Sequence, residues 1–305
     1  MTRRDLILLA ALSLIWGASF MFIRVADREI DPWALVFLRV GLGALVLVPA
    51  ALVTGRGRAL RQARDTWWAL LFLGVVNTAV PFLLFSWSET RITSSLAAIL
   101  QAAAPIFTVL IGVALGLERV GGRRLAGFLV GFAGVALLLG SPGGGGILAA
   151  LAVVLAAFCY ACGATFASRK LTGVDPLVIG AGSCVVATIV TAPPGIAKFP
   201  TSVPGWKETG SVVVLGLVGT GIAYVLFFAL IASAGASRSV LVTYMIPPVA
   251  LVYGAVLLGE PIRWEAIAGL VLILAGVAFA AGKRREPMET RSGTLDSANT
   301  AWESP

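Results

Sequence analysis

Three polar side chains in apolar stretches of the chain each stand four positions before a proline. The pairs are Asn77 and Pro81, Gln101 and Pro105, and Thr243 and Pro247. Proline inside a helix donates no backbone hydrogen bond, so the carbonyl four residues earlier is left without its partner. A free carbonyl beside an amide or hydroxyl on a kinked helix suits the binding of a polar ligand group. The alternative is that each side chain bonds only to its own distorted helix or to a neighbour.

Aromatic side chains add an apolar counterpart to these polar groups. Trp16, Tyr160, Tyr224 and Tyr244 fall inside apolar stretches. Their rings can hold the apolar part of a ligand while their polar edges offer hydrogen bonds. The predicted binding site therefore consists of Trp16, Asn77, Gln101, Tyr160, Tyr224, Thr243 and Tyr244. Rings in apolar helices also serve at membrane interfaces or in packing, and the sequence leaves that alternative open for each one.

Residues that could bind a metal or act in catalysis are scarce. The chain has no histidine, and Cys159 and Cys162 form a C-x-x-C pair without a second pair. Both cysteines lie in an apolar stretch, where a thiol behaves as a small hydrophobic group. We therefore expect no metal site, no cofactor and no enzymatic activity.

Charged residues near the predicted site are few. No Asp or Glu lies near the middle of an apolar stretch, which argues against a simple carboxylate proton relay, although Glu89 at the end of one stretch remains a candidate. Arg39 can attract an anionic ligand group or pair with a nearby carboxylate, and we favour the pairing. Its candidate partners are Asp27, Glu29 and Asp31.

Long apolar segments must position all these residues. The chain is 58% hydrophobic and 12% charged, against about 45–50% and about 25% for a soluble domain. Segments of roughly 17 to 25 apolar residues, each long enough to cross a bilayer, recur along the chain. The sequence therefore predicts an all-α integral membrane protein with ten transmembrane helices, at about residues 5–25, 33–53, 67–88, 92–116, 123–140, 147–168, 176–197, 211–232, 239–259 and 265–282.

The distribution of charge predicts how the chain is oriented. The net charge of +8 could suggest nucleic acid, but the basic residues gather in alternate loops. They cluster before residue 5, at 56–64, 119–124 and 169–170, at Arg238 and at 283–285, whereas the opposite side carries only Arg28, Arg91, Lys198, Lys207 and Arg263. The positive-inside rule then places both termini in the cytoplasm of a multi-pass protein of the cytoplasmic membrane. Residues 283–305 are polar and predict a disordered cytoplasmic tail.

The chain contains an internal repeat. Asp31-Pro32 matches Asp175-Pro176 at an offset of 144 residues, and Pro105, Gly127 and Gly134 match Pro247, Gly269 and Gly276 at an offset of 142. The repeats cover residues 5–140 and 147–282 with five predicted helices each. Because five is odd, the second repeat enters the membrane in the opposite sense. Duplication retained only for stability is the alternative.

These patterns resemble the EamA-type transporters of the drug/metabolite transporter superfamily. Each half resembles one EamA repeat, with Trp16-Gly17, Phe37-Leu38-Arg39 and the spacing from Pro105 to Gly134 in the first half. The second half has Tyr160-Ala161 and Ser183 in place of the tryptophan-glycine pair and the arginine. The resemblance implies a ten-helix carrier with inverted repeats and a central cavity, among relatives that export amino acids and other metabolites.

We therefore predict a secondary transporter that alternates access around a central cavity and exports amino acids or related amphipathic compounds. The direction of transport rests on the resemblance alone. A membrane receptor or scaffold that transports nothing is the alternative, and a membrane enzyme ranks third. The expected partners are the lipid bilayer and a small-molecule substrate, with no nucleic acid. Two halves in one chain allow a monomer to work alone, and the sequence leaves a homodimer open.

Overall fold

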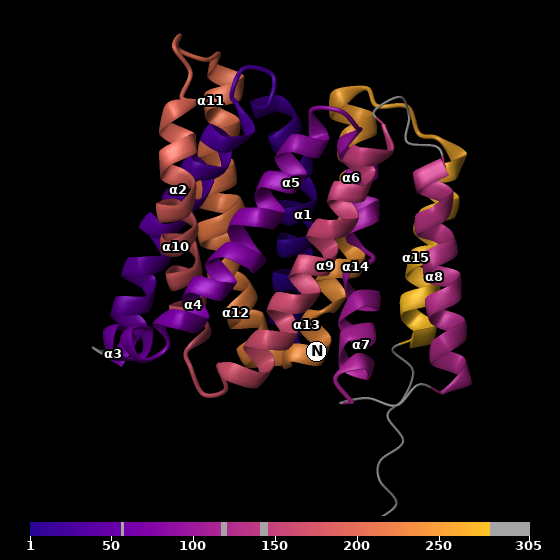
Figure 1. Cartoon of the computed structure of the whole chain (residues 1–305), viewed down its shortest axis with the longest axis horizontal. Coiled ribbons are helices and arrows are strands. Elements are labelled where there is room, and N and C mark those ends of the chain that lie inside the picture. Colours follow the sequence, from indigo (N-terminus) through magenta and orange to yellow (C-terminus); the bar gives the residue numbers. More distant parts are fainter. Residues whose placement is uncertain (56–57, 117–120, 141–145, 281–305) are drawn as a thin grey trace, which may run out of the picture.

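The computed structural model describes residues 1–55, 58–116, 121–140 and 146–280, and every regular element in this part is helical (Figure 1). The first α-helices along the chain are α1 (Arg3–Ala26), α2 (Pro32–Thr54), α3 (Arg58–Asp65), α4 (Trp67–Leu73) and α5 (Val80–Glu89). The π-helix η1 (Gly74–Ala79) joins α4 to α5. Next come α6 (Ser94–Gln101), α7 (Ala104–Ala114), α8 (Gly122–Gly140), α9 (Ile147–Lys170) and α10 (Pro176–Ala197). The last elements are α11 (Trp206–Val213), the π-helix η2 (Val214–Ile222), α12 (Ala223–Ala234), α13 (Ala236–Ser239), α14 (Leu241–Leu258) and α15 (Trp264–Ala280).

Eight helical segments in the described residues are long and apolar enough to cross a membrane. They are Arg3–Ala26, Pro32–Thr54, Trp67–Glu89, Ser94–Ala114, Ile147–Lys170, Pro176–Ala197, Trp206–Ala234 and Leu241–Leu258. The segments predicted as the fifth and tenth spans form shorter apolar helices, Leu125–Gly140 and Trp264–Phe279. The predicted tail at 283–305 lies outside the described residues.

Asp-Pro pairs start one long helix in each half. Asp31 caps α2 by accepting a hydrogen bond from the Trp33 amide at 2.9 Å, and Asp175 caps α10 through the Leu177 amide at 2.8 Å. The proline that follows each aspartate occupies the first helical turn, where its missing N–H costs nothing. The same local chemistry therefore begins both helices.

Several helices are irregular near the predicted polar positions. The π-helix η1 contains Asn77 and precedes Pro81, and η2 lies at the matching place in the second half. A break separates α6 from α7 directly after Gln101, with Pro105 in the first turn of α7. In contrast, α14 continues through Pro247. Irregular turns of this kind leave backbone groups free for other partners.

Helices that match under the internal repeat, at an offset of 144 or 142 residues, also pack on each other. α2 packs along α10, and α8 packs along α15 at the right edge of Figure 1. A Cβ atom on Gly276 would lie 2.5 Å from the Gly131 nitrogen, and one on Gly134 would lie 2.9 Å from the Gly269 carbonyl oxygen. The backbones of α8 and α15 therefore approach closely only because glycine occupies these positions.

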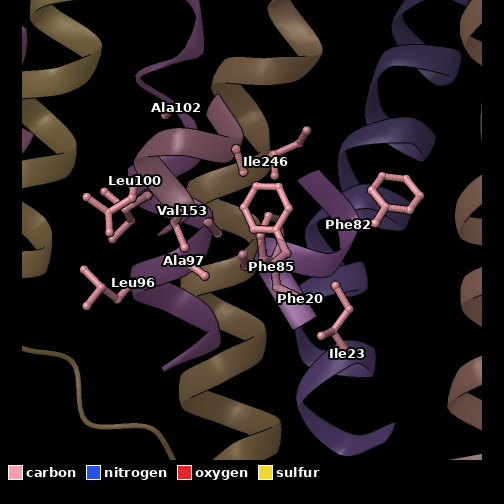
Figure 2. Packing of buried hydrophobic residues seen from close by; sticks show 14 of the residues in the cluster. Phe20, Ile23, Phe82, Phe85, Leu96, Ala97, Leu100, Ala102, Val153 and Ile246 are labelled. Atoms are coloured by element: carbon pink, nitrogen blue, oxygen red, sulfur yellow. The ribbon is translucent and has the colours of Figure 1, made fainter. Parts of the chain in front are cut away.

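A cluster of buried apolar side chains fills one part of the bundle. Figure 2 shows Phe20 and Ile23 of α1 near Phe85 of α5, with Ile246 of α14 beside them. The rings of Phe20 and Phe85 meet edge to face, with their centroids 5.7 Å apart. This apolar layer separates the centre of the bundle from the end at which α1 and α5 terminate.

Candidate functional site

A cavity of about 530 Å³ lies at the centre of the bundle. Its volume is typical of a site for a small organic molecule. All seven side chains predicted as ligand-binding line it, and they come from α1, η1, α6, α9, α12 and α14. Of the three predicted kink prolines, Pro105 lines the cavity, while Pro81 and Pro247 do not belong to its wall. The two halves of the chain thus contribute to one cavity.

Unpartnered polar groups face this space from several helices. The side chains of Asn77, Gln101 and Thr243 line the cavity and have no hydrogen-bond partner among the described residues. Asn77 packs closely on α9, because a Cβ atom on Gly163 would lie 2.3 Å from its Oδ1. An amide placed in this way is held in position by packing and keeps its hydrogen-bonding capacity for a ligand.

Aromatic rings form the apolar wall. The Trp16 indole Nε1 donates a hydrogen bond to the Gly219 carbonyl at 3.1 Å, so this ring is oriented by a carbonyl of the π-helix η2. The edge of Trp16 meets Tyr224 with 6.3 Å between ring centroids. On the other side, Tyr160 stacks on Phe85 with 6.0 Å between centroids. The rings are therefore held by one another and by the backbone before any ligand arrives.

Arg39 of α2 also lines the cavity, although the pattern of the sequence favoured a structural ion pair for it. Its side chain is only 6% exposed. The Nε–H donates to the Thr220 hydroxyl at 3.1 Å, and the guanidinium lies 4.0 Å from the centroid of the Phe82 ring. These contacts fix the side chain but do not neutralise its charge.

The predicted pairing of Arg39 with a nearby carboxylate is wrong. Among the described residues, the Asp27 carboxylate accepts a hydrogen bond from the Ser86 hydroxyl, and the Glu29 carboxylate accepts one from the Gly205 amide. Asp31 caps α2. Each of the three carboxylates thus accepts a hydrogen bond from a group other than Arg39. The sequence did contain an indication that Arg39 has no ion-pair partner. Arg39 stands inside an apolar stretch, and no acidic residue lies one helical turn away from it.

The charge of the cavity follows from its lining. Within the described residues that form the wall, Arg39 is the single charged side chain. A buried cation without a counter-ion is costly unless a ligand or solvent supplies negative charge. The site is therefore suited to a small molecule that carries a carboxylate or another anion beside an apolar part. In the described part of the chain, no three His, Cys, Asp or Glu side chains gather to hold a metal ion.

The cavity is closed at the end where α1 and α5 terminate. The lining residues there are deeply buried, with Ile23 and Phe85 each 3% exposed, and Figure 2 shows them in the apolar layer. At the opposite end, where the N-terminus lies in Figure 1, the lining includes Val240 at the start of α14, which is 40% exposed. The structure thus has one sealed end and one more accessible end.

Known proteins of similar sequence are named as transporters. A protein of Archaeoglobus fulgidus called an uncharacterized transporter is 26% identical over 91% of this chain and 99% of its own length. A probable terminal-alkyne amino-acid exporter of Streptantibioticus cattleyicolor is 29% identical over 89% of this chain and 92% of its length. A probable amino-acid metabolite efflux pump of Escherichia coli is 27% identical over 91% of this chain and 94% of its own length.

Comparison with solved structures supports the fold. One crystal structure superimposes with a TM-score of 0.64 at 23% identity, and the match covers 92% of this chain and 97% of the other. The sequence profile of the EamA-like transporter family matches residues 4–140 and, separately, residues 147–282. The two matches together take in almost the entire helical part of the chain. The protein described here therefore belongs to the EamA-like transporter family.

Proposed function

We propose that this protein exports amino acids or closely related carboxylate-bearing amphipathic compounds across the cytoplasmic membrane. The observation that carries the proposal is Arg39, a buried and unpaired cation on the wall of a cavity otherwise lined by aromatic rings and unpartnered polar groups. The amino-acid exporters and efflux pumps among its relatives support the same substrate class.

Each part of such a substrate has a counterpart in the cavity. The substrate carboxylate binds the outer guanidinium nitrogens of Arg39, since charge-assisted hydrogen bonds are among the strongest available in a protein. Asn77 and Gln101 bind the amino or other polar group through their amide oxygens. The rings of Trp16 and Tyr224 hold the apolar side chain.

The proposed architecture is ten membrane-spanning helices in two inverted repeats, with both termini in the cytoplasm. The contacts between α8 and α15 support it. Gly134 approaches Gly269, and Gly127 approaches Gly276. The 142-residue offset converts the first contact into the second, which is the pattern expected at a two-fold axis. The short apolar segments Leu125–Gly140 and Trp264–Phe279 supply the fifth and tenth spans.

Transport in this proposal alternates between two states of one cavity. The sealed end at Phe85 and the accessible end near Val240 correspond to a state open toward the N-terminal side of the bundle. Export requires that the apolar layer at Phe85 separates while the opposite end closes. We propose the monomer as the transporting unit, because one chain supplies both halves of the cavity.

Counterflow into proteoliposomes tests the proposal. Vesicles that contain purified protein are loaded with one unlabelled compound from a panel of amino acids and their amides, and entry of the radiolabelled compound is followed. We expect saturable counterflow that is lost in the Asn77→Ala, Gln101→Ala double variant. Arg39→Gln should raise the KM for carboxylates by about tenfold or more, because one charge-assisted hydrogen bond is lost. The KM for the amides should change little.

Arg91→Gln provides the matched control. Arg91 is exposed and stacks on Trp87 at the end of α5, outside the cavity. This variant should transport like the wild type. Equal loss of carboxylate and amide counterflow in Arg39→Gln would contradict the assignment of Arg39 to the carboxylate, and absence of counterflow by every compound in the wild type would contradict the substrate class.

A further inference from the structure

Two carboxyl groups lie one helical turn beyond the sealed end of the cavity. Ile23 lines the cavity from α1, and Asp27 follows it by four residues. Phe85 lines the cavity from α5, and Glu89 follows it by four residues. Positions four apart share a face of a helix. The acidic groups therefore stand behind the apolar layer that must separate when the cavity opens to the other side.

Glu89 is buried without any hydrogen-bond donor. Its side chain is 0% exposed, and within the described residues neither carboxylate oxygen has a hydrogen-bond partner. The nearest guanidinium, that of Arg24, donates to the backbone carbonyl of Glu89 and not to its carboxylate. An ionised carboxylate without donors is strongly unfavourable in such a place.

Asp27 is the neighbour that bears most directly on Glu89. One of its oxygens accepts the Ser86 hydroxyl at 2.7 Å, and the other has no partner among the described residues. Ser86 and Glu89 are three residues apart on α5, so Asp27 and Glu89 meet on one face of this helix. The hydrogen bond from Ser86 leaves half of the Asp27 carboxylate unsatisfied.

Four charged groups from the surrounding elements act on the Glu89 carboxyl. Asp27 after α1 and Glu260 after α14 are acidic, whereas Arg24 on α1 and Arg39 on α2 are basic. Both arginines are committed elsewhere, Arg24 to a backbone carbonyl and Arg39 to Thr220. Glu260 is committed to the first amides of α6. Glu89 is fully buried, has no hydrogen-bond donor of its own among the described residues and lies near two other acidic groups, so it is stable here as the neutral acid.

We propose that Glu89 is the proton-binding site of this transporter, with Asp27 beside it, and that one proton is exchanged for each exported substrate. The proposal rests on the transport function proposed above. The neutral acid stabilises the sealed end, because only an uncharged group tolerates that burial. The ionised form favours the opposite state, in which the separated helices admit water to the carboxylate.

In the proposed cycle, substrate binding loosens the apolar layer enough for water from the cavity to reach Glu89. Glu89 loses its proton to this water, and the resulting carboxylate favours opening of the sealed end with the substrate bound. After the substrate leaves, the carboxylate takes a proton from water on the outer side, and the sealed end closes again. One proton therefore enters as one substrate molecule leaves.

Gradient-driven accumulation tests this coupling in the same proteoliposomes. A gradient of about two pH units, acidic inside, should make wild-type vesicles accumulate the radiolabelled panel compound that shows the strongest counterflow. Glu89→Gln imitates the neutral acid in shape, so the protein should fold and keep a measurable exchange of substrate. Accumulation in response to the pH gradient should be lost. Glu265→Gln, in the first turn of α15, serves as the control and should keep both activities.

A second measurement does not depend on transport. Infrared spectra of the purified protein at neutral pH should contain the carbonyl absorption of protonated carboxylic acids. Burial raises the pKa of Asp27 to about 8, so Asp27 contributes to this absorption beside Glu89. One component should therefore be lost in Glu89→Gln, the other in Asp27→Asn, and both should persist in Glu265→Gln. Gradient-driven accumulation by Glu89→Gln, accumulation driven by sodium instead of protons, or an infrared absorption that Glu89→Gln leaves unchanged would each overturn the proposal. Absence of counterflow in the wild type contradicts the transport function, and the infrared comparison then still decides whether Glu89 holds a proton.

Discussion

At the scale of residues, burial governs the charged groups around the cavity. The Arg39 side chain on the cavity wall is 6% exposed, and the Glu89 side chain behind the sealed end is 0% exposed. Burial disfavours the ionised form of such groups unless partners compensate it. Asp27, the neighbour of Glu89, shows what this burial implies for stability.

Asp27 gives a prediction about pH and stability. It directly follows α1, and burial raises its pKa from 3.8 to about 8, against the opposing effects of the Ser86 hydrogen bond and the Arg24 charge. The folded protein thus binds this proton more tightly than the unfolded chain does. Its contribution to stability is complete below about pH 4 and is lost as pH rises through about 8.

Asp27→Asn should therefore weaken the fall in thermal stability over this range. Unfolding midpoints of the detergent-solubilised protein, measured at a series of pH values, check this expectation. Asp65→Asn is the control, because Asp65 is exposed and pairs only with the exposed Arg64. A slope in Asp27→Asn as steep as that of the wild type and of Asp65→Asn would refute the assignment.

The sequence predicted part of the candidate site. Proline spacing and rings in apolar stretches pointed to seven side chains, and all of them line one cavity, while their binding of a ligand stays a prediction. The free charge of Arg39 had only an indirect signal, the lack of an acidic residue one helical turn away. Its unpaired state also depends on Ser86 and Gly205, which bind Asp27 and Glu29 from distant parts of the chain. Contacts of this range follow from helix packing and have no local pattern.

At the scale of elements, local sequence accounts for the starts of helices better than for their interruptions. Asp-Pro pairs begin α2 and α10 where expected, and the break after Gln101 fits the proline that follows it. The π-helix η2 has no such signal. Its Thr220 accepts from Arg39 of α2 while donating to the Leu215 carbonyl, five residues earlier. A partner in another helix is thus part of its geometry.

The glycine contact between α8 and α15 gives a prediction for one element pair. A Cβ atom on Gly276 would meet backbone atoms of α8, including the Gly127 carbonyl oxygen at 2.6 Å. Backbone cannot rotate away, so Gly276→Ala should push the helices apart and cost about 1–3 kcal/mol. Thermal unfolding in detergent measures the loss.

Gly140→Ala is the matched control on α8. Nothing lies within 4 Å of a Cβ atom built on Gly140, so this change should leave the unfolding midpoint unchanged or slightly raised. Equal midpoints for the two alanine variants would show that the close approach of α8 to α15 does not limit stability.

At the scale of the whole molecule, the sealed and accessible ends predict a pattern of chemical labelling. In a background with Cys159, Cys162 and Cys184 replaced by alanine, Val240→Cys should react readily with a water-soluble maleimide, since Val240 is 40% exposed. Ile23→Cys should react slowly, since Ile23 is 3% exposed within the apolar layer. Added substrate should raise the reactivity at position 23 as the sealed end opens.

The order of reactivity decides between two states of the protein. Faster labelling at position 23 than at position 240 without substrate would mean that the protein in detergent rests in the opposite state. Internal similarity predicted two related halves from sequence, and the family profile matches each of them. Which end is closed was not predictable, because the two states of the proposed transport cycle would share one sequence and therefore every local pattern in it.

The paired helices α8 and α15 also bear on how the molecule can move. Gly134 and Gly276 bring the two backbones into direct contact, with few long side chains between them. Small sliding motions between packed helices are one of the common forms of conformational change. A backbone contact of this kind should allow α8 and α15 to slide along each other with little repacking of side chains, while it resists their separation.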